Sequence, residues 1–203
     1  RGPRGLRGGR VAPAVSRRAA MLPPLGLPAR ADDAAEQVAA LLGALDALSA
    51  QASLTDADLA ARFDALAARH LDRAAMLLAA LGHARRGIGD ADWARLQAAF
   101  DAHLAWGFVL GVRRQGASVS RVLGSRMPAG GGTVVVARIR AGTRERDVLF
   151  FACAHDPARI CDIEAEGERA SARHRAAFAP VLDAEGLDAL ISALASGRLA
   201  ALD

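Results

Sequence analysis

The 203-residue sequence contains no Tyr, no Lys and few aromatic side chains of any kind. Phe, Trp and Tyr together make up 4% of the chain, so Leu, Val, Ile and Ala must supply most of a core. The absence of Lys from an Ala- and Arg-rich chain is typical of a GC-rich genome and indicates no particular chemistry. No apolar run approaches the roughly 18 residues that a membrane-spanning helix needs. A chain of this length is expected to form one domain, here residues 32–203.

Motifs of familiar enzyme classes are also missing. No G-x-S-x-G nucleophile elbow occurs, and the glycines at 130–132 lack the Lys and following helix of a phosphate-binding loop. The five His residues are scattered singly, and a turn explains Asp156 beside His155 without chemistry. The two Cys lack a nearby His cluster, which argues against a zinc site. We therefore expect no catalytic residue, cofactor or metal. The alternative is a small-molecule enzyme that uses His155 or His70.

The positive charge is concentrated at the N-terminus. The formal net charge is +4 and the sequence pI is about 10.6. Residues 1–31 contain seven Arg and no acidic residue, so the remaining 19 Arg are outnumbered by the 22 acidic residues. The main part of the chain is therefore mildly acidic, which argues against nucleic-acid binding through phosphate contacts.

Residues 1–31 have the layout of an export signal. A basic segment precedes a short apolar run at 19–27, and the A-R-A sequence at 29–31 has the form of a cleavage site. The S-R-R sequence at 16–18 also resembles a twin-arginine signal. An export signal would place the mature protein in the periplasm. The same composition is compatible with a disordered basic tail.

The hydrophobic pattern predicts helices, then strands, then helices. Apolar residues at helical spacing predict helices over 34–50, 73–83 and 91–113. Another helix follows the first and is opened by a capping box at 55–58. Alternating or β-branched runs predict strands over 118–123, 133–140, 147–154 and 159–166. Two further helices follow Gly167 and Gly186. Short connections between consecutive strands indicate a four-stranded antiparallel meander, so we expect an α+β fold with helices packed on one sheet face.

Two groups on the predicted strands have more than one interpretation. Cys153 and Cys161 lie on neighbouring strands, where they form either a disulfide or two buried thiols. Asp162, Glu164 and Glu166 alternate along one strand and so point to one side. A solvated sheet face explains these carboxylates better than a cation site does.

Alternate strand residues should form the face of the sheet that the helices cover. We predict Val134, Val136, Leu149, Phe151 and Ile163 for this face. Such a layer either closes tightly on the helices or leaves an apolar pocket that is large enough for an acyl chain.

Several short motifs follow each other in a characteristic order over about residues 55–199. They are Leu71-Asp72, Leu81-Gly82, Arg85-Arg86, an A-F…L helix segment from residue 99, the D-I-E-A-E-G sequence at 162–167 and the G-L-D-A-L-I sequence at 186–191. In this order the motifs resemble the MlaC family of toluene-tolerance auxiliary proteins, in which the last two correspond to the end of a strand and the closing helix. The hopanoid-associated branch of the family matches equally well.

The resemblance implies a cone-shaped fold, similar to that of nuclear transport factor 2, and a periplasmic carrier without bond chemistry. Family members hold phospholipid acyl chains between sheet and helices and exchange lipid with an inner-membrane ABC transporter and an outer-membrane lipoprotein complex. On this basis a set of apolar side chains is expected to contact lipid: Phe63, Met76, Leu104, Phe108, Val112, Val134, Val136, Leu149, Phe151, Ile163 and Phe178.

The sequence departs from the family pattern at three places. Ala158 and Ala84 replace a family Trp and an aromatic residue, and 168–171 is E-R-A-S where the family continues with apolar residues. A degenerate member that acts as a non-catalytic interaction subunit of the transporter is therefore the alternative to a lipid carrier.

Overall fold

A computed structural model describes residues 29–129 and 131–200. These residues form six α-helices, one 3-10 helix and one five-stranded sheet. The helices are α1 (Ala29–Ser49), α2 (Asp56–His70), α3 (Arg73–Leu81), η1 (Gly82–Gly87), α4 (Asp90–Gln115), α5 (Ala170–Glu185) and α6 (Leu187–Ala195). The predicted leader lies outside the described residues except for 29–31, which begin helix α1. No helix among the described residues is long and apolar enough to cross a membrane.

The sheet is an open antiparallel meander in the strand order β1-β2-β3-β4-β5. Its strands are β1 (Ser118–Arg126), β2 (Val134–Ala141), β3 (Arg144–Ala152), β4 (Ile160–Ala165) and β5 (Glu168–Arg169). The predicted α+β class is confirmed, but the sheet has a short fifth strand in addition to the four predicted. Glu166 and Gly167, with φ of 56° and 81°, turn the chain back onto β4 and create β5. Glu166 therefore lies in a turn and does not extend the carboxylate row of β4.

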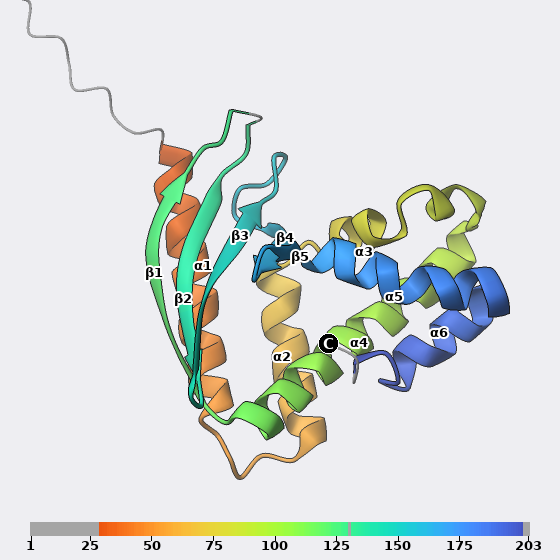
Figure 1. Ribbon diagram of the computed structural model, residues 1–203, viewed down its shortest axis with the longest axis horizontal. Helices are drawn as coiled ribbons and strands as arrows, with labels where there is room; N and C mark the ends of the chain where they lie inside the picture. The colour runs from red at the N-terminus through yellow and green to blue at the C-terminus, as the bar shows by residue number, and fades with distance from the viewer. Residues whose placement is uncertain (1–28, 130, 201–203) are drawn as a thin grey trace, which may run out of the picture.

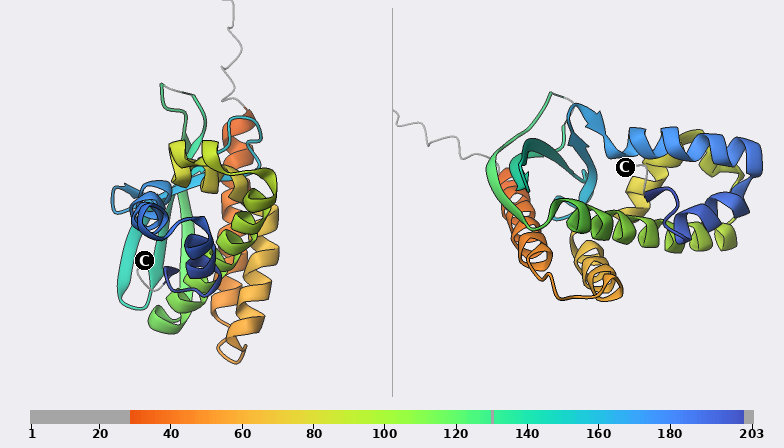
Figure 2. Two further views of the ribbon diagram at one scale, coloured as in Figure 1. Left: turned by 90° about the vertical axis from the view of Figure 1, so that its right-hand side faces the viewer. Right: turned by 60° about the horizontal axis from the view of Figure 1, so that its bottom comes forward.

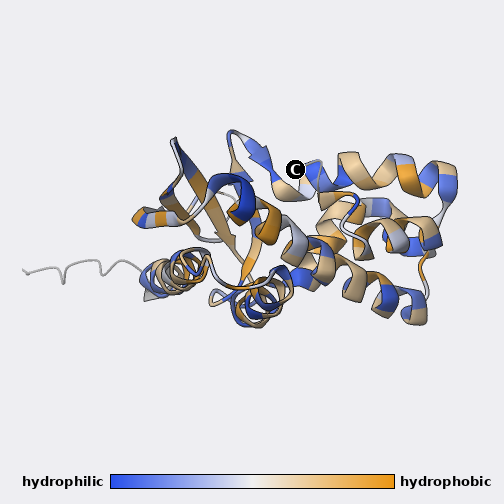
Figure 3. Ribbon diagram, turned by 90° about the horizontal axis from the view of Figure 1, so that it is seen from below, coloured by the Kyte–Doolittle hydropathy of each residue, from blue (hydrophilic) through white to orange (hydrophobic). Residues whose placement is uncertain are grey.

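Helices cover one face of the sheet, which we call the core face. Helix α1 packs along β1 and β2, as Figure 1 shows, while helices α3 to α6 extend beyond β4. Figure 2 shows α1 and α2 lying side by side below the curved sheet. In Figure 3, hydrophobic and hydrophilic residues alternate around these two helices, as expected for helices with one buried side.

The phase of the strands is opposite to the predicted one. Val135, Phe150 and Ile163 are in register across three strands, and all three pack in or against the main core. Of the five residues predicted for this face, Ile163 is the one that lies on it. The other four lie on the opposite face: Val134, Val136, Leu149 and Phe151. This opposite face, which we call the outer face, also carries charged residues: Arg138 and Asp147 pair across it with an Nε–Oδ1 distance of 2.6 Å.

The helix boundaries agree with the pattern in most places and differ at the first helix. Helix α1 begins at Ala29 and not at residue 34, so Asp32 lies in its first turn, where a carboxylate interacts favourably with the helix dipole. The predicted cap at 55–58 is confirmed, because Thr55 Oγ1 accepts a hydrogen bond from the Asp58 backbone N–H at 3.1 Å.

A polar clamp joins α1 to the edge strand β1. The Asp46 carboxylate accepts hydrogen bonds from the hydroxyl of Ser118 at 2.6 Å and from the backbone N–H of Ser120 at 2.6 Å. Ser49 Oγ accepts another bond from the Ser118 backbone N–H at 2.9 Å. These bonds fix the edge strand on the helix that covers the core face.

Cys153 and Cys161 form a disulfide that spans eight residues of sequence and joins the end of β3 to β4. This selects one of the two alternatives that the sequence left open. With a loop of this length, the chain-entropy relation gives a stabilisation of about 2–3 kcal/mol.

Two neighbouring leucines of α3 allow a matched test of the core. Leu77 is fully buried, whereas Leu78 is 50% exposed. We expect Leu77→Ala to lower the free energy of unfolding by about 2–5 kcal/mol because it leaves a cavity in the core. Leu78→Ala should change it by less than about 0.5 kcal/mol. Urea denaturation followed by circular dichroism measures both values, and equal losses in the two variants would contradict this assignment of the core.

Candidate functional site

A cavity of about 360 Å³ lies between helix α4 and the β3–β4 part of the core face. Residues of α2, α3 and α5 complete its wall. We call it the α4 cavity. Its apolar wall consists of Phe63, Leu71, Met76, Leu104, Leu110, Ile163, Ala165, Ala170 and Ala200. A volume in this range is typical of small-molecule sites, which are lined mainly by apolar side chains.

The cavity exists because one side of α4 carries glycines. Leu104, Gly107, Gly111 and Arg114 follow each other at spacings of three, four and three residues, so they share one face of the helix. A Cβ atom built on either glycine would have nothing within 4 Å apart from the adjoining backbone of its own helix and its two neighbours in the chain. The helix therefore presents bare backbone to the cavity where most helices would present side chains.

Charged side chains form a second part of the lining. Arg114, Arg146 and Arg173 come from α4, β3 and α5, and Glu168 comes from β5. The Glu168 carboxylate lies 3.4 Å from Nε of Arg173 and offsets part of the charge. The local balance remains positive, so the cavity combines an apolar wall with groups that favour an anion.

Two buried histidines line the same cavity. The rings of His103 and His174 lie 5.2 Å apart, edge to face, and both contact Phe100 and Phe178. Burial lowers the pKa of His103 to about 4. Burial, with a smaller contribution from the neighbouring His103 and Arg173, lowers the pKa of His174 to about 3. Both imidazoles are therefore neutral at pH 7 and keep this part of the wall weakly polar.

The eleven residues predicted to contact lipid fall into three groups. Four of them line the α4 cavity: Phe63, Met76, Leu104 and Ile163. Phe178 lies among the buried aromatic rings, and Phe108 stacks on Phe63 at 4.8 Å with Val112 beside it in a smaller core cluster. The four residues on the outer sheet face do not line the cavity; on that face the Arg169 guanidinium covers the Phe151 ring at 3.6 Å.

The sequence interpretation missed most polar and glycine positions of the lining. Gly107 and Gly111 had a recognisable signal, because glycine is unfavourable inside a helix and two of them fall on the Leu104 face. His103 and His174 had none, since nothing in the sequence brings residues 71 positions apart together. Asp162 was expected on a solvated face, yet it is buried and accepts hydrogen bonds from the backbone N–H and hydroxyl of Ser171 at the start of α5.

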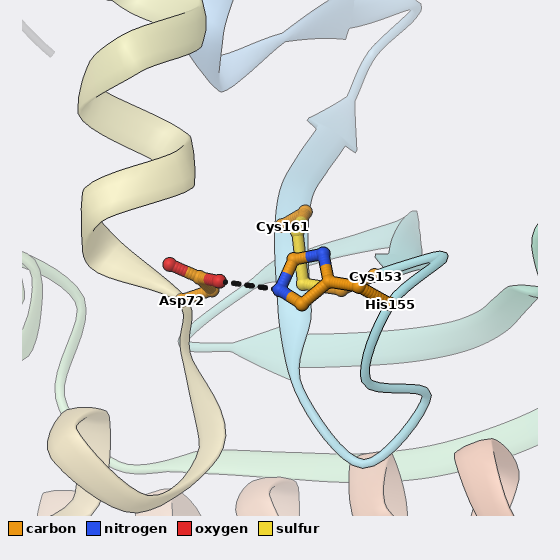
Figure 4. A group of neighbouring side chains, drawn as sticks. All are labelled: Asp72, Cys153, His155 and Cys161. Carbon is orange, nitrogen blue, oxygen red and sulfur yellow. Dashed lines mark hydrogen bonds and ion pairs between the residues drawn. A yellow bond between two sulfur atoms is a disulfide. The ribbon is translucent and has the colours of Figure 1, made fainter.

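A second cluster lies at the disulfide. Figure 4 shows His155 pointing toward Asp72, with the His155 Nε2 to Asp72 Oδ2 distance at 3.0 Å, next to Cys153 and Cys161. The partner of His155 is thus Asp72 and not its sequence neighbour Asp156. Neither His155 nor His70 lines the α4 cavity, so the two histidines on which the predicted enzymatic alternative was based lie outside it.

The buried histidines predict an acid-sensitive fold. Their folded-state pKa values lie below the ordinary value of 6.5, so their stabilising contribution is fully present above pH 6.5 and is lost as pH falls toward 4. Between pH 7 and pH 5 we expect each of the two histidines to lower the free energy of unfolding by about 2 kcal/mol. In His103→Gln, which cannot be protonated, the loss over this interval should be smaller by that amount. Urea denaturation at the two pH values measures it, and an unchanged pH dependence in the variant would contradict the assignment.

Comparison with known proteins agrees with this geometry. A family model described as "MlaC protein" matches residues 36–196. A phospholipid-binding protein from Ralstonia solanacearum, solved in complex with a phospholipid, superposes with a TM-score of 0.66 at 15% sequence identity. The match covers 84% of this chain and 98% of that one. Among curated proteins no significant match is found. At such low identity the superposition shows a shared fold, while the family model covers more than half of the chain. The chain therefore belongs to the MlaC family.

Proposed function

We propose that the protein is a lipid carrier that holds an acyl chain of the lipid in the α4 cavity and catalyses no reaction. The observation that carries the proposal is the cavity itself, an apolar space bounded by Leu104, Ile163 and two helical glycines, with arginines in its lining. Membership of the MlaC family and the phospholipid bound by the Ralstonia protein of the same fold support it.

The energetics favour carriage of lipid over its release into water. Each methylene removed from water contributes about 0.8 kcal/mol, so a chain of about sixteen methylenes gains roughly 13 kcal/mol. A bilayer offers a similar gain, so a carrier with an apolar cavity exchanges lipid with membranes at small net cost. The cavity arginines would contact the phosphate, because guanidinium groups bind phosphate oxygens through two parallel hydrogen bonds.

The setting proposed for this exchange is the periplasm, after export directed by the leader, and the S-R-R sequence at 16–18 favours the twin-arginine route. The partners would be an inner-membrane ABC transporter and an outer-membrane lipoprotein complex, as the family resemblance implies. The family membership supports this part of the proposal.

Filling the cavity from α4 tests the lipid site. Gly107→Leu and Gly111→Leu place a side chain into open space on the cavity wall. We expect at least a tenfold loss of affinity for a fluorescent fatty acid, while the gain in helix propensity of up to about 1 kcal/mol keeps the fold stable. Gly43→Leu is the matched control, because Gly43 is also helical with open space around its Cβ atom but does not line the cavity. A folded Gly107→Leu variant that binds the probe like the wild type would refute the proposed site.

Removing one cavity arginine tests recognition of the phosphate. Arg146 lines the cavity, whereas Arg144 on the same strand is exposed and does not. We expect Arg146→Ala to weaken binding of a lysophospholipid by about tenfold, the effect of losing one charged hydrogen bond. Binding of an uncharged monoacylglycerol should change little, and Arg144→Ala should affect neither ligand. Fluorescence displacement titrations give the four affinities; an equal loss for charged and uncharged lipid would show that Arg146 does not contact phosphate.

A further inference from the structure

We propose that, when the disulfide is reduced, Asp72, Cys153, His155 and Cys161 form a four-ligand zinc site. The sequence argued against zinc because the two cysteines lacked a nearby His cluster. The fold supplies the missing ligands, one from the β3–β4 connection and one from the start of α3. This site is separate from the α4 cavity, so it stands or falls independently of lipid binding.

The four ligand atoms are already close enough for one ion. One carboxylate oxygen, one imidazole nitrogen and the two sulfur atoms all lie within 4.8 Å of one another. In a tetrahedral site with zinc bonds of about 2.0–2.3 Å, neighbouring ligand atoms are roughly 3.3–3.8 Å apart. The required movements are therefore on the order of 1 Å, which side-chain rotation supplies.

Backbone contacts hold the ligands in place from both sides. The Asp72 N–H donates to the Ile160 carbonyl at 2.9 Å, which ties the start of α3 to β4 one residue from Cys161. The Cys153 N–H donates to the Arg159 carbonyl at 2.8 Å and closes the connection that carries His155. Asp72 uses Oδ1 to cap α3 through the Ala75 N–H, so Oδ2 is the oxygen directed at His155.

The burial of the cluster suits an ion that enters from solvent. Cys153 is buried, while the side chains of Asp72 and His155 are 17% and 66% exposed. The two thiolates and the imidazole are soft or borderline ligands that select zinc over magnesium or calcium. With neutral imidazole, the three anionic ligands leave the zinc complex with a net charge of −1.

The disulfide and the metal exclude each other. A dithiol reductant transfers two electrons and two protons to the Cys153–Cys161 bond and is itself oxidised to a disulfide. Zinc then displaces the two thiol protons and binds both sulfurs as thiolates. Reoxidation reverses the sequence and releases the ion. The cluster thus has an oxidised form closed by a covalent bond and a reduced form closed by zinc.

Metal titration of the reduced and oxidised full chain tests this proposal. The protein is treated with a chelator, reduced with a phosphine under nitrogen and titrated with zinc, and with cobalt as a spectroscopic probe. We expect one equivalent of either metal to bind the reduced chain, with the visible ligand-field bands and the near-ultraviolet thiolate bands of tetrahedral cobalt. The oxidised chain should bind neither ion stoichiometrically.

Single ligand variants distinguish this site from nonspecific thiol binding. His155→Asn and Asp72→Asn, the latter retaining a capping side chain, should each weaken zinc binding at least about tenfold. His83→Asn, which alters an exposed histidine of η1, should not. Equal zinc affinity in His155→Asn and the wild type would overturn the proposal. Stoichiometric zinc binding by the oxidised chain would also overturn it. Circular dichroism of the reduced chain gives two further contradicting results: a folded chain that binds no zinc, and an unfolded chain that zinc does not refold.

Discussion

The antiparallel sheet has one apolar face, and covering that face is the constraint on which the rest of the structure depends. Helix α1 covers the part formed by β1 and β2 and is held there by Asp46 and the serines of β1. The part formed by β3 and β4 lies opposite α4, which packs mainly on α2 and α6. With few bulky side chains in the sequence, and with glycines on the facing side of α4, this part of the face is not filled. The α4 cavity is the space that remains.

The same shortage of bulky groups explains the composition of the cavity wall. Leucine, isoleucine, alanine and glycine leave a smooth apolar surface. The two neutral histidines that also line the cavity pack against the aromatic rings of Phe100 and Phe178, which lie behind the wall. Arginines from three separate elements supply the positive charge. A lipid with an acyl chain and a phosphate group needs both features, and they meet in one space.

The element order and most helix boundaries could be predicted from the sequence because hydrophobic spacing and capping residues act locally. The strand phase could not be read from Val134-Val135-Val136, where three apolar residues follow each other without alternation. The outward-facing Arg138 carried the missing signal: residues two and four positions before it share its face, which puts Val136 and Val134 outside. Contacts between distant residues, such as His155 with Asp72 and Asp162 with Ser171, follow from packing that no local pattern encodes.

The central claim is that the α4 cavity binds lipid, and the most direct measurement is mass spectrometry of the intact protein purified without detergent from a periplasmic extract. A lipid of defined mass should remain bound at close to one molecule per chain and be absent from the Gly107→Leu variant. Organic extraction of the same sample should identify it as a phospholipid or a related acyl lipid. A folded wild-type chain that carries no lipid, and acquires none when mixed with phospholipid vesicles, would contradict the claim.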